Sequence, residues 1–187
     1  MNKAIVIYNP ISGKGLGQRA ADAIKISKLN DLFQLTICQT AYSGHAKEIT
    51  SKGLEDGVRY FIAVGGDGTI NEVGSVLKGK DAALGIIPMG SGNGLAKHIG
   101  MSTDYNQAIL QLCNAKENSI DTLTINNRFA VNVSGFGFDG YVAYRFNHHG
   151  KRGLSTYTKI GLTEYFKYPL QEFEISFDNQ KKQVKKH

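Results

Sequence analysis

Two glycine-rich turns, each behind a short apolar run, hold the residues whose types and spacing could do chemistry. The first covers residues 65–69 (Gly-Gly-Asp-Gly-Thr) and the second covers residues 90–94 (Gly-Ser-Gly-Asn-Gly). Glycine lets backbone N–H groups approach a bulky anion, and a following helix points its positive end at the same place. A bare carboxylate repels phosphate, so Asp67 makes sense if it faces a metal ion or a proton-bearing hydroxyl. This combination indicates phosphoryl transfer.

Both turns also have a purely structural explanation. A single glycine-rich turn after a strand is common, because tight turns need positive φ. Two such turns on one sheet edge favour a binding site instead. Thr69 and Glu72 form a Thr-x-x-Glu pattern, which is typical of a capping box at a helix start. Glu72 is therefore either a cap or a ligand.

Other polar candidates follow the first two apolar runs. Residues 9–15 (Asn-Pro-Ile-Ser-Gly-Lys-Gly) lack the spacing of a P-loop. Their position still puts Asn9, Ser12 and Lys14 near the same crevice, where Lys14 is either a phosphate contact or a solvated loop lysine. His45 has no visible metal partner, so we expect a structural role. No G-x-S-x-G elbow occurs, so the sequence shows no nucleophilic triad.

Apolar runs alternate with stretches of helical spacing over the first two thirds of the chain. The predicted strands cover residues 4–8, 35–38, 60–64 and 83–87, and the predicted helices cover residues 16–29, 44–54, 70–77 and 105–112. Asp104 is the expected N-cap of the last helix. This alternation predicts an α/β fold with a parallel sheet, in which ligands bind beyond the carboxyl ends of the strands. Both glycine turns would then face one crevice.

The pattern changes near Asp121. Residues 123–125 and 129–133 flank a tight Asn-rich turn and predict a β-hairpin. A helix over residues 154–168 and a strand over residues 173–177 follow, and the strand opens a hairpin that we do not expect to be completed. We therefore predict an α/β nucleotide-binding domain over residues 1–121, and over residues 122–187 the start of a truncated β-sandwich acceptor domain.

The overall composition limits the partners. Lys and Arg number 22 against 16 Asp and Glu, a formal net charge of +6 that suits anionic partners in general. Base-stacking motifs for nucleic acid are missing, so no nucleic-acid partner is expected. Cys38 and Cys113 lack metal-ligand spacing, and the chain shows neither a signal peptide nor an apolar run of about 20 residues. A reduced, cytoplasmic protein is the simplest interpretation.

Three ordered motifs resemble the diacylglycerol kinase catalytic domain. They are Asn9-Pro10 with Ser12-Gly13, residues 65–73, and residues 88–93, and the likeness continues through residues 136–139 and 151–157. This family groups bacterial diacylglycerol-kinase-like lipid kinases with sphingosine and ceramide kinases, and it shares its glycine-aspartate turn with NAD kinases. The resemblance implies a three-layer, NAD kinase-like α/β domain followed by a β-sandwich. Its implied activity is ATP-dependent phosphorylation of a lipid hydroxyl, for which diacylglycerol and sphingoid-like lipids are the candidate acceptors.

The resemblance also implies site residues. Asp67 would be the catalytic carboxylate, acting as a base or contacting the Mg²⁺ carried by the nucleotide, while Asn93 and Asp139 would lie on the acceptor side. Lys151 or Arg152 would reach the phosphates. The implied set for binding ATP is Asn9, Thr40, Gly65, Gly66, Gly68, Thr69, Glu72, Gly90, Ser91, Gly92, Lys151 and Arg152. The implied cofactors are ATP and Mg²⁺.

The resemblance implies a cytoplasmic enzyme that associates peripherally with the membrane surface, where its lipid acceptor lies. It leaves open whether the enzyme is a homodimer. Many bacterial members carry Asp where this chain has Gly94, and members continue beyond this length with further strands and acidic residues. We therefore expect an N-terminal fragment that folds its first domain but is impaired in turnover. The alternatives are NAD kinase-like phosphorylation of a soluble acceptor and a nucleotide-binding module without turnover.

Overall fold

The computed structural model describes residues 1–148, 154–169, 171–177 and 180–186. The chain forms two compact units, Met1–Val133 and Ser134–His187. The pattern in the sequence changes near Asp121, but the boundary between the compact units lies after Val133. The hairpin that follows Asp121 belongs to the first unit, where its second strand contacts a helix that packs on the sheet.

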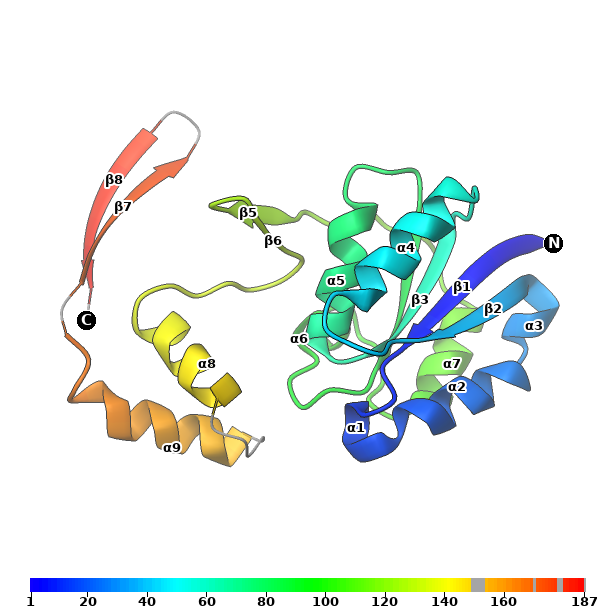
Figure 1. The fold of residues 1–187 in the computed structure, drawn as a ribbon, viewed down its shortest axis with the longest axis horizontal. Helices are drawn as coiled ribbons and strands as arrows, with labels where there is room; N and C mark the ends of the chain where they lie inside the picture. The colour runs from blue at the N-terminus through cyan, green and yellow to red at the C-terminus, as the bar shows by residue number, and fades with distance from the viewer. Residues whose placement is uncertain (149–153, 170, 178–179, 187) are drawn as a thin grey trace. The chain divides into compact units, whose positions relative to one another are not determined.

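The first unit is built on a four-stranded sheet in which all neighbouring strands are parallel (Figure 1). The strands are β1 (Asn2–Tyr8), β2 (Phe33–Gln39), β3 (Tyr60–Gly65) and β4 (Ala83–Pro88). Their order is β2-β1-β3-β4, so the direction of winding reverses between β1 and β3. This reversal is the switch point at which open α/β sheets bind ligands. The predicted parallel α/β sheet is confirmed.

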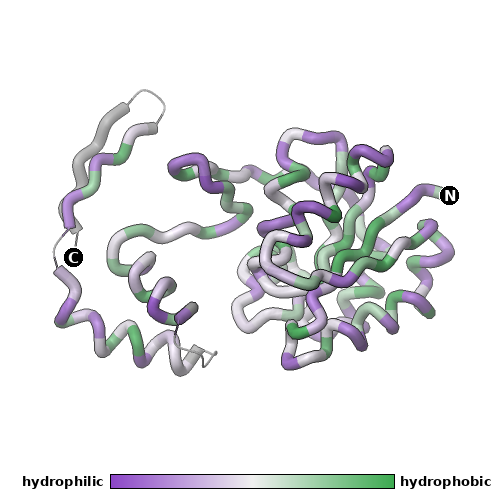
Figure 2. The backbone as a smooth tube through the Cα atoms, in the orientation of Figure 1, coloured by the Kyte–Doolittle hydropathy of each residue, from purple (hydrophilic) through white to green (hydrophobic). Residues whose placement is uncertain are grey.

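Helices cover both faces of the sheet and produce three layers. One face carries α4 (His45–Glu55), α5 (Asp67–Leu77) and α6 (Gly94–His98), and the other carries α2 (Gly17–Lys25), α3 (Leu29–Leu32) and α7 (Tyr105–Cys113). Side chains alternate between the faces, because Ile5 and Ile7 join the first core while Val6 and Tyr8 join the second. Figure 2 shows the resulting hydrophobic strands between helices that carry the polar residues.

The predicted helix over residues 16–29 is wrong in its length. It ends at Lys25, and the short α3 begins at Leu29. The side-chain amide of Asn30 donates to the carbonyl oxygens of Ile24 (3.0 Å) and Lys25 (2.6 Å). These carbonyls would otherwise need helical partners further along the chain, so the side chain ends the helix by satisfying them.

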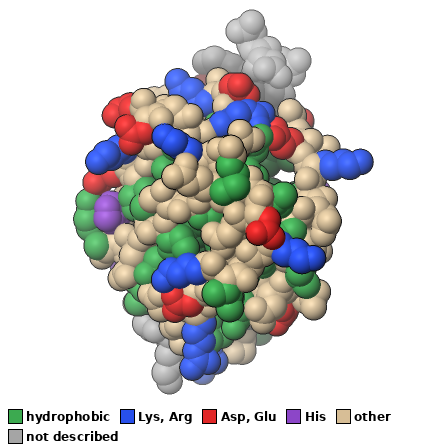
Figure 3. All heavy atoms as spheres, turned by 90° about the vertical axis from the view of Figure 1, so that its right-hand side faces the viewer, with side chains coloured by type: hydrophobic (Ala, Val, Ile, Leu, Met, Phe, Trp, Pro, Cys, Tyr) green, Lys and Arg blue, Asp and Glu red, His purple; other side chains and the backbone are tan. Residues whose placement is uncertain are grey.

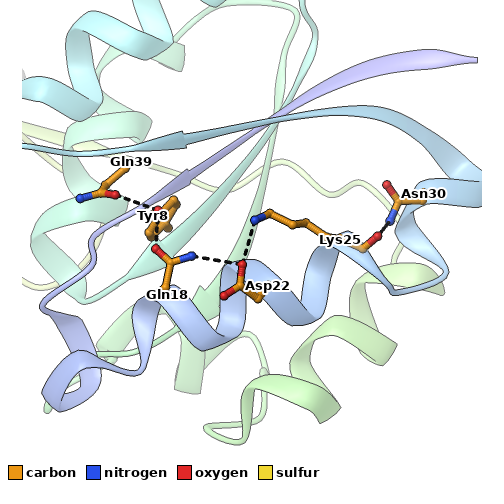
Figure 4. A network of polar contacts seen from close by, with 6 residues as sticks. All are labelled: Tyr8, Gln18, Asp22, Lys25, Asn30 and Gln39. Carbon is orange, nitrogen blue, oxygen red and sulfur yellow. Dashed lines mark hydrogen bonds and ion pairs between the residues drawn. The ribbon is translucent and has the colours of Figure 1, made fainter.

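A polar network fixes the carboxyl ends of β1 and β2 against α2 (Figure 4). The Tyr8 hydroxyl lies 2.6 Å from Oε1 of Gln18 and 2.9 Å from Oε1 of Gln39. Gln18 in turn donates to the carboxylate of Asp22 over 3.1 Å, and Lys25 pairs with the same carboxylate over 2.8 Å. The end of the sheet that leads into the loops is therefore braced by side chains.

The predicted hairpin after Asp121 is confirmed and is shorter than expected. Strands β5 (Leu123–Ile125) and β6 (Arg128–Ala130) pair antiparallel. The two turn residues, Asn126 and Asn127, have φ angles of 47° and 63°. Positive φ at both central positions is typical of the tight hairpin turn whose twist matches that of the strands.

The second unit contains α8 (Phe138–His148), α9 (Leu154–Tyr165) and the antiparallel pair β7 (Gln171–Phe177) and β8 (Gln180–Lys186). Helix α8 was not predicted from the sequence. The expectation of an incomplete last hairpin is wrong, because β8 pairs along the whole of β7. Within this unit the buried carboxylate of Glu164 accepts hydrogen bonds from the Tyr141 hydroxyl (2.9 Å) and from Arg145 (3.3 Å), which ties α8 to α9.

Charged side chains of both signs are interspersed on the face turned to the viewer in Figure 3. Lys and Arg there lie beside Asp and Glu. The formal net charge of +6 is therefore not concentrated on this face.

Candidate functional site

The loops that leave the four strands meet at the carboxyl edge of the sheet, as the topology predicts. Three of these loops, those after β1, β2 and β4, begin with a backbone hydrogen bond to the neighbouring strand. These bonds run from Thr40 N to Tyr8 O (2.9 Å), from Asn9 N to Val64 O (3.0 Å) and from Met89 N to Gly65 O (2.8 Å). The sequence-predicted residues Asn9, Thr40, Gly65 and Gly90 are thus brought to one edge.

The two glycine-rich turns touch backbone to backbone at Gly66 and Gly90. A Cβ atom built on Gly90 would lie 2.6 Å from the Cα of Gly66, and one built on Gly66 would lie 3.1 Å from the Cα of Gly90. Neither position has room for a side chain without moving main chain. Glycine at these positions is therefore required by packing, whatever else the turns bind.

Asp67 links the two turns through its carboxylate. Its Oδ2 accepts a hydrogen bond from the backbone N–H of Asn93 (2.8 Å) and its Oδ1 accepts one from the N–H of Gly94 (2.7 Å). The side chain is nevertheless exposed. Each carboxylate oxygen keeps a further lone pair for a cation or a hydroxyl. Asp67 therefore has a structural role that the sequence analysis did not predict, beside its proposed chemical one.

Asn93, predicted on the acceptor side, is a buried brace of the second turn. Its backbone is left-handed, with φ at 54°, and its side chain is 4% exposed. The side chain accepts from Gly90 N (2.7 Å) and donates to Gly90 O (2.8 Å). Because both ends of its amide are engaged, Asn93 shapes the turn rather than presenting a free group.

The first turn of α5 presents open amide groups. The helix is capped by Gly66, which offers no side-chain cap, and within the described residues the N–H groups of Asp67, Gly68 and Thr69 have no acceptor. A Cβ built on Gly68 meets nothing within 4 Å, and its φ is not left-handed. Thr69 is buried beneath Gly65. Neither packing nor backbone conformation explains glycine at position 68.

Glu72 does not complete the capping box that Thr69 suggests. Its Oε1 accepts a hydrogen bond from Gly44 N (3.0 Å), at the start of α4. In the same loop His45 accepts from Ala41 N through Nδ1 (3.0 Å), and its ring stacks on Tyr42 with centroids 4.6 Å apart. Glu72 and His45 therefore hold the loop after β2 in place.

The loop after β1 contains three successive left-handed residues. Gly13, Lys14 and Gly15 have φ angles of 60°, 58° and 88°, inside the segment labelled α1 (Ser12–Gly15). Lys14 is exposed, and its backbone conformation is unusual for a residue with a side chain. The loop is anchored by Asn9, whose backbone oxygen accepts from both the amide and the hydroxyl of Ser12.

Asn71 contributes to the site although the sequence indicates no role for it beyond its place in the motif of residues 65–73. Its side-chain amide donates to Phe129 O (3.2 Å) and accepts from Val131 N (3.1 Å). The side chain therefore binds the main chain of β6 and of the residue that follows it, and fixes this end of the hairpin to α5. An asparagine at the second position of a predicted helix was the signal available for this contact.

The remaining predicted site residues lie in different parts of the chain, and two of them fall outside the described residues. Ser91 is exposed, and a Cβ built on Gly92 would lie 2.7 Å from Oδ2 of Asp67. Asp139 is an exposed residue in the first turn of α8, in the second unit. Lys151 and Arg152 lie outside the described residues.

The described residues also limit how a metal ion or a membrane could be bound. No group of three or more His, Cys, Asp or Glu side chains there could hold a metal ion. The exposed carboxylate of Asp67 could contact a Mg²⁺ ion that is carried on phosphates, a common arrangement for this metal. In the same part of the chain, no helix has the length and hydrophobicity needed to cross a membrane.

Comparison with known proteins agrees with this architecture. Residues 3–125 match the family model of the diacylglycerol kinase catalytic domain. The chain therefore belongs to the diacylglycerol kinase catalytic domain family. It is similar to a diacylglycerol kinase of Staphylococcus saprophyticus, with 33% identity over 144 residues, which is 76% of this chain and 47% of the relative. A diacylglycerol kinase of Staphylococcus epidermidis is 34% identical over 146 residues, 76% of this chain and 46% of that protein.

Solved structures share the fold. One from Bacillus anthracis str. Sterne has a TM-score of 0.80 at 23% identity, covering 98% of this chain and 62% of that one. A second from the same organism, a diacylglycerol kinase by its description, has a TM-score of 0.70 at 20% identity, covering 98% of this chain and 60% of that one. The chain spans about half the length of the curated relatives it matches.

Proposed function

We propose that this chain binds ATP at the carboxyl edge of its sheet and carries the nucleotide half of a lipid kinase. The observation that carries the proposal is the open first turn of α5, where three N–H groups lack an acceptor among the described residues and Gly68 has free space above it. An anion as large as a polyphosphate suits such a helix start. Family membership supports a kinase as the class of enzyme.

The proposed roles follow from the contacts. The amides of the first turn of α5 bind phosphate oxygens, and the second turn supplies further main chain beside them. A Mg²⁺ ion bound to the phosphates would neutralise part of their charge, and Asp67 is the residue that could contact it. The acceptor hydroxyl oxygen forms a bond to the terminal phosphorus, the bond from that phosphorus to the bridging oxygen breaks, and ADP leaves.

Asp67 is placed for one of two tasks in this scheme. It either receives the proton that the acceptor hydroxyl loses, or it would contact the Mg²⁺ on the phosphates, in which case that proton passes to the transferred phosphate or to water. Both tasks use the lone pairs that its hydrogen bonds to Asn93 N and Gly94 N leave free. The braces from Asn93 to Gly90 hold the second turn rigid, so that the carboxylate keeps its position.

The proposed acceptor is a lipid hydroxyl such as that of diacylglycerol, so the protein would work at a membrane surface. This part of the proposal is supported by the names of the relatives. Incubation of the full-length protein with labelled ATP and either diacylglycerol vesicles or NAD tests it. We expect label in the lipid, while label in NAD, or none in either acceptor, would contradict the lipid assignment.

Nucleotide binding is tested on the chain itself with a matched pair of variants. Gly68→Ala puts a methyl group into the space where phosphate is proposed, whereas Gly161→Ala puts one into equally open space in α9. Calorimetric titration with Mg-ATP should show at least about tenfold weaker binding for Gly68→Ala, which corresponds to roughly 1.4 kcal/mol. Gly161→Ala should bind like the unmodified chain, and equal affinities for all three proteins would refute the proposed site.

A further inference from the structure

Asn132 lies against the start of α6, in the space that a side chain at position 94 would need. A Cβ built on Gly94 would clash with Nδ2 of Asn132 and would lie 3.7 Å from Oδ1 of Asp67. The Asn132 amide and the Asp67 carboxylate therefore both lie around Gly94. Many bacterial members of the family carry Asp where this chain has Gly94. In this chain a side chain at residue 94 would collide with Asn132, which explains the glycine.

The position of Asn132 is set by firm contacts just before it. Asn71 holds the backbone of Phe129 and Val131, and the side chains of these two residues pack over Gly74 of α5, at 3.5 Å and 3.7 Å from a Cβ built there. The segment is thus fixed to the same helix that begins with Asp67. Asn132 is the next residue along the chain, so the contacts of Phe129 and Val131 with α5 hold its side chain at the site.

Among the described residues, the side-chain amide of Asn132 has no hydrogen-bond partner. The residue is half-buried, and because no fully buried polar side-chain atom of the described residues lacks a partner, the amide atoms of Asn132 remain accessible to solvent. Asn93, by contrast, uses both ends of its amide on Gly90. A half-buried amide that packs at the site and keeps its hydrogen-bonding capacity can bind a polar ligand there at little structural cost.

We infer that Asn132 donates a hydrogen bond to an oxygen of the terminal phosphate of bound ATP. This inference rests on the function proposed above. A phosphoryl group near Asp67 meets a like charge, and a neutral donor beside the carboxylate offsets part of that repulsion without itself adding charge. The terminal phosphate is the one that must come nearest to Asp67, because it is the group transferred. Asn132 would then favour the binding of ATP over that of ADP, which lacks the terminal phosphate.

The test compares the affinities of Mg-ATP and Mg-ADP for the 187-residue chain and its variants by calorimetry. Asn132→Ala should weaken ATP binding about tenfold, the loss of one good hydrogen bond, while ADP binding changes less than about twofold. Asn132→Asp should weaken ATP binding further, because it adds a second negative charge. Asn106→Ala, an exposed asparagine on α7, is the matched control and should leave both affinities unchanged.

A second variant tests the contact with Gly94. Gly94→Ala should push the amide aside and lower ATP affinity in the unmodified chain, yet cause no further loss in Asn132→Ala, where the amide is gone. Equal losses in both backgrounds would overturn the inference, as would Asn132→Ala proteins that bind both nucleotides normally or weaken both equally. Failure of the unmodified chain to bind either nucleotide would instead refute the proposed function and the inference with it.

Discussion

The carboxylate of Asp67 and the backbone N–H of Asn93 are joined by a 2.8 Å hydrogen bond that crosses from one glycine-rich turn to the other. Together with the 2.7 Å bond to Gly94 N, it makes the acidic residue of the first turn the anchor of the second. The residue best placed for chemistry therefore also maintains the geometry of the site. Loss of activity on substituting Asp67 will combine a chemical and a structural effect.

The structural effect can be measured by itself, through the stability of the Asp67→Asn variant. The amide keeps one acceptor oxygen but turns an N–H₂ group toward a backbone donor, so one of the two bonds is lost. We expect the free energy of unfolding to fall by about 1–2 kcal/mol, measured by urea denaturation. Asp56→Asn, an exposed aspartate at the end of α4, should leave stability unchanged. A variant at 67 as stable as the unmodified chain would show that the two bonds do not hold the second turn.

Gly90→Ala and Gly68→Ala should have opposite effects on stability although both lie in the glycine turns. At Gly90 the new methyl group meets the main chain of Gly66 at 2.6 Å and the Asn93 side chain at 2.8 Å, which should cost about 1–3 kcal/mol. At Gly68 it meets nothing, and the loss of backbone freedom in the unfolded chain should stabilise the protein by up to about 1 kcal/mol. Thermal unfolding of both variants checks this, and an equal loss in both would contradict the packing described.

Asn71→Ala should release the segment after β6 from α5. It removes two hydrogen bonds to the main chain, to Phe129 O and from Val131 N. We expect amide hydrogen exchange at Val131 to accelerate at least about tenfold, because its partner is lost. Asn114→Ala, which removes only an exposed contact to Leu110 O, is the control. Unchanged exchange at Val131 would mean that the hairpin is held by its apolar side chains alone.

The ion pair between Arg59 and Glu117 gives the stability a pH dependence. Arg59 donates two hydrogen bonds of 2.7 Å to Glu117, which hold the pKa of this carboxyl below its usual range. A carboxyl with a lowered pKa in the folded state stabilises the protein fully above its ordinary pKa, and this contribution disappears as the pH falls through the lowered value.

Glu117→Gln should therefore be less stable than the unmodified chain at pH 7, and the difference should shrink as the pH falls below about 4.3, the ordinary glutamate pKa. Urea titrations from pH 7 to pH 3 measure it. Glu55→Gln, an exposed glutamate at the end of α4, should show no such trend. A difference that stays constant or grows in acid would contradict the assignment.

The sheet and the meeting of its loops could be predicted because their signals are local. Strands buried on both faces appear as apolar runs, and parallel topology alone brings their carboxyl ends together. The N-cap at Asp104 was equally local, and its carboxylate accepts from Gln107 N over 2.9 Å. These features depend on neighbours within a few positions along the chain.

The hydrogen bonds of the site could not be predicted, since they join residues far apart in the sequence. Asp67 and Asn93 are separated by 26 positions, and Glu72 bonds to Gly44 across 28. The Thr-x-x-Glu pattern suggested a local cap for Glu72, but the N-cap of α5 is Gly66 rather than Thr69, and the Glu72 carboxylate binds the neighbouring loop instead. Helix α8 was missed because its aromatic residues do not fall on one face in a clear helical pattern.

The central claim is that the open first turn of α5 binds the phosphates of a nucleotide. Titration of the ¹⁵N-labelled chain with Mg-ATP, followed by the backbone amide signals, tests it most directly. We expect saturable shifts that are largest at Asp67, Gly68 and Thr69, the three amides that lack acceptors among the described residues. Saturation with these three signals unmoved, or no saturable shift at all, would contradict the account.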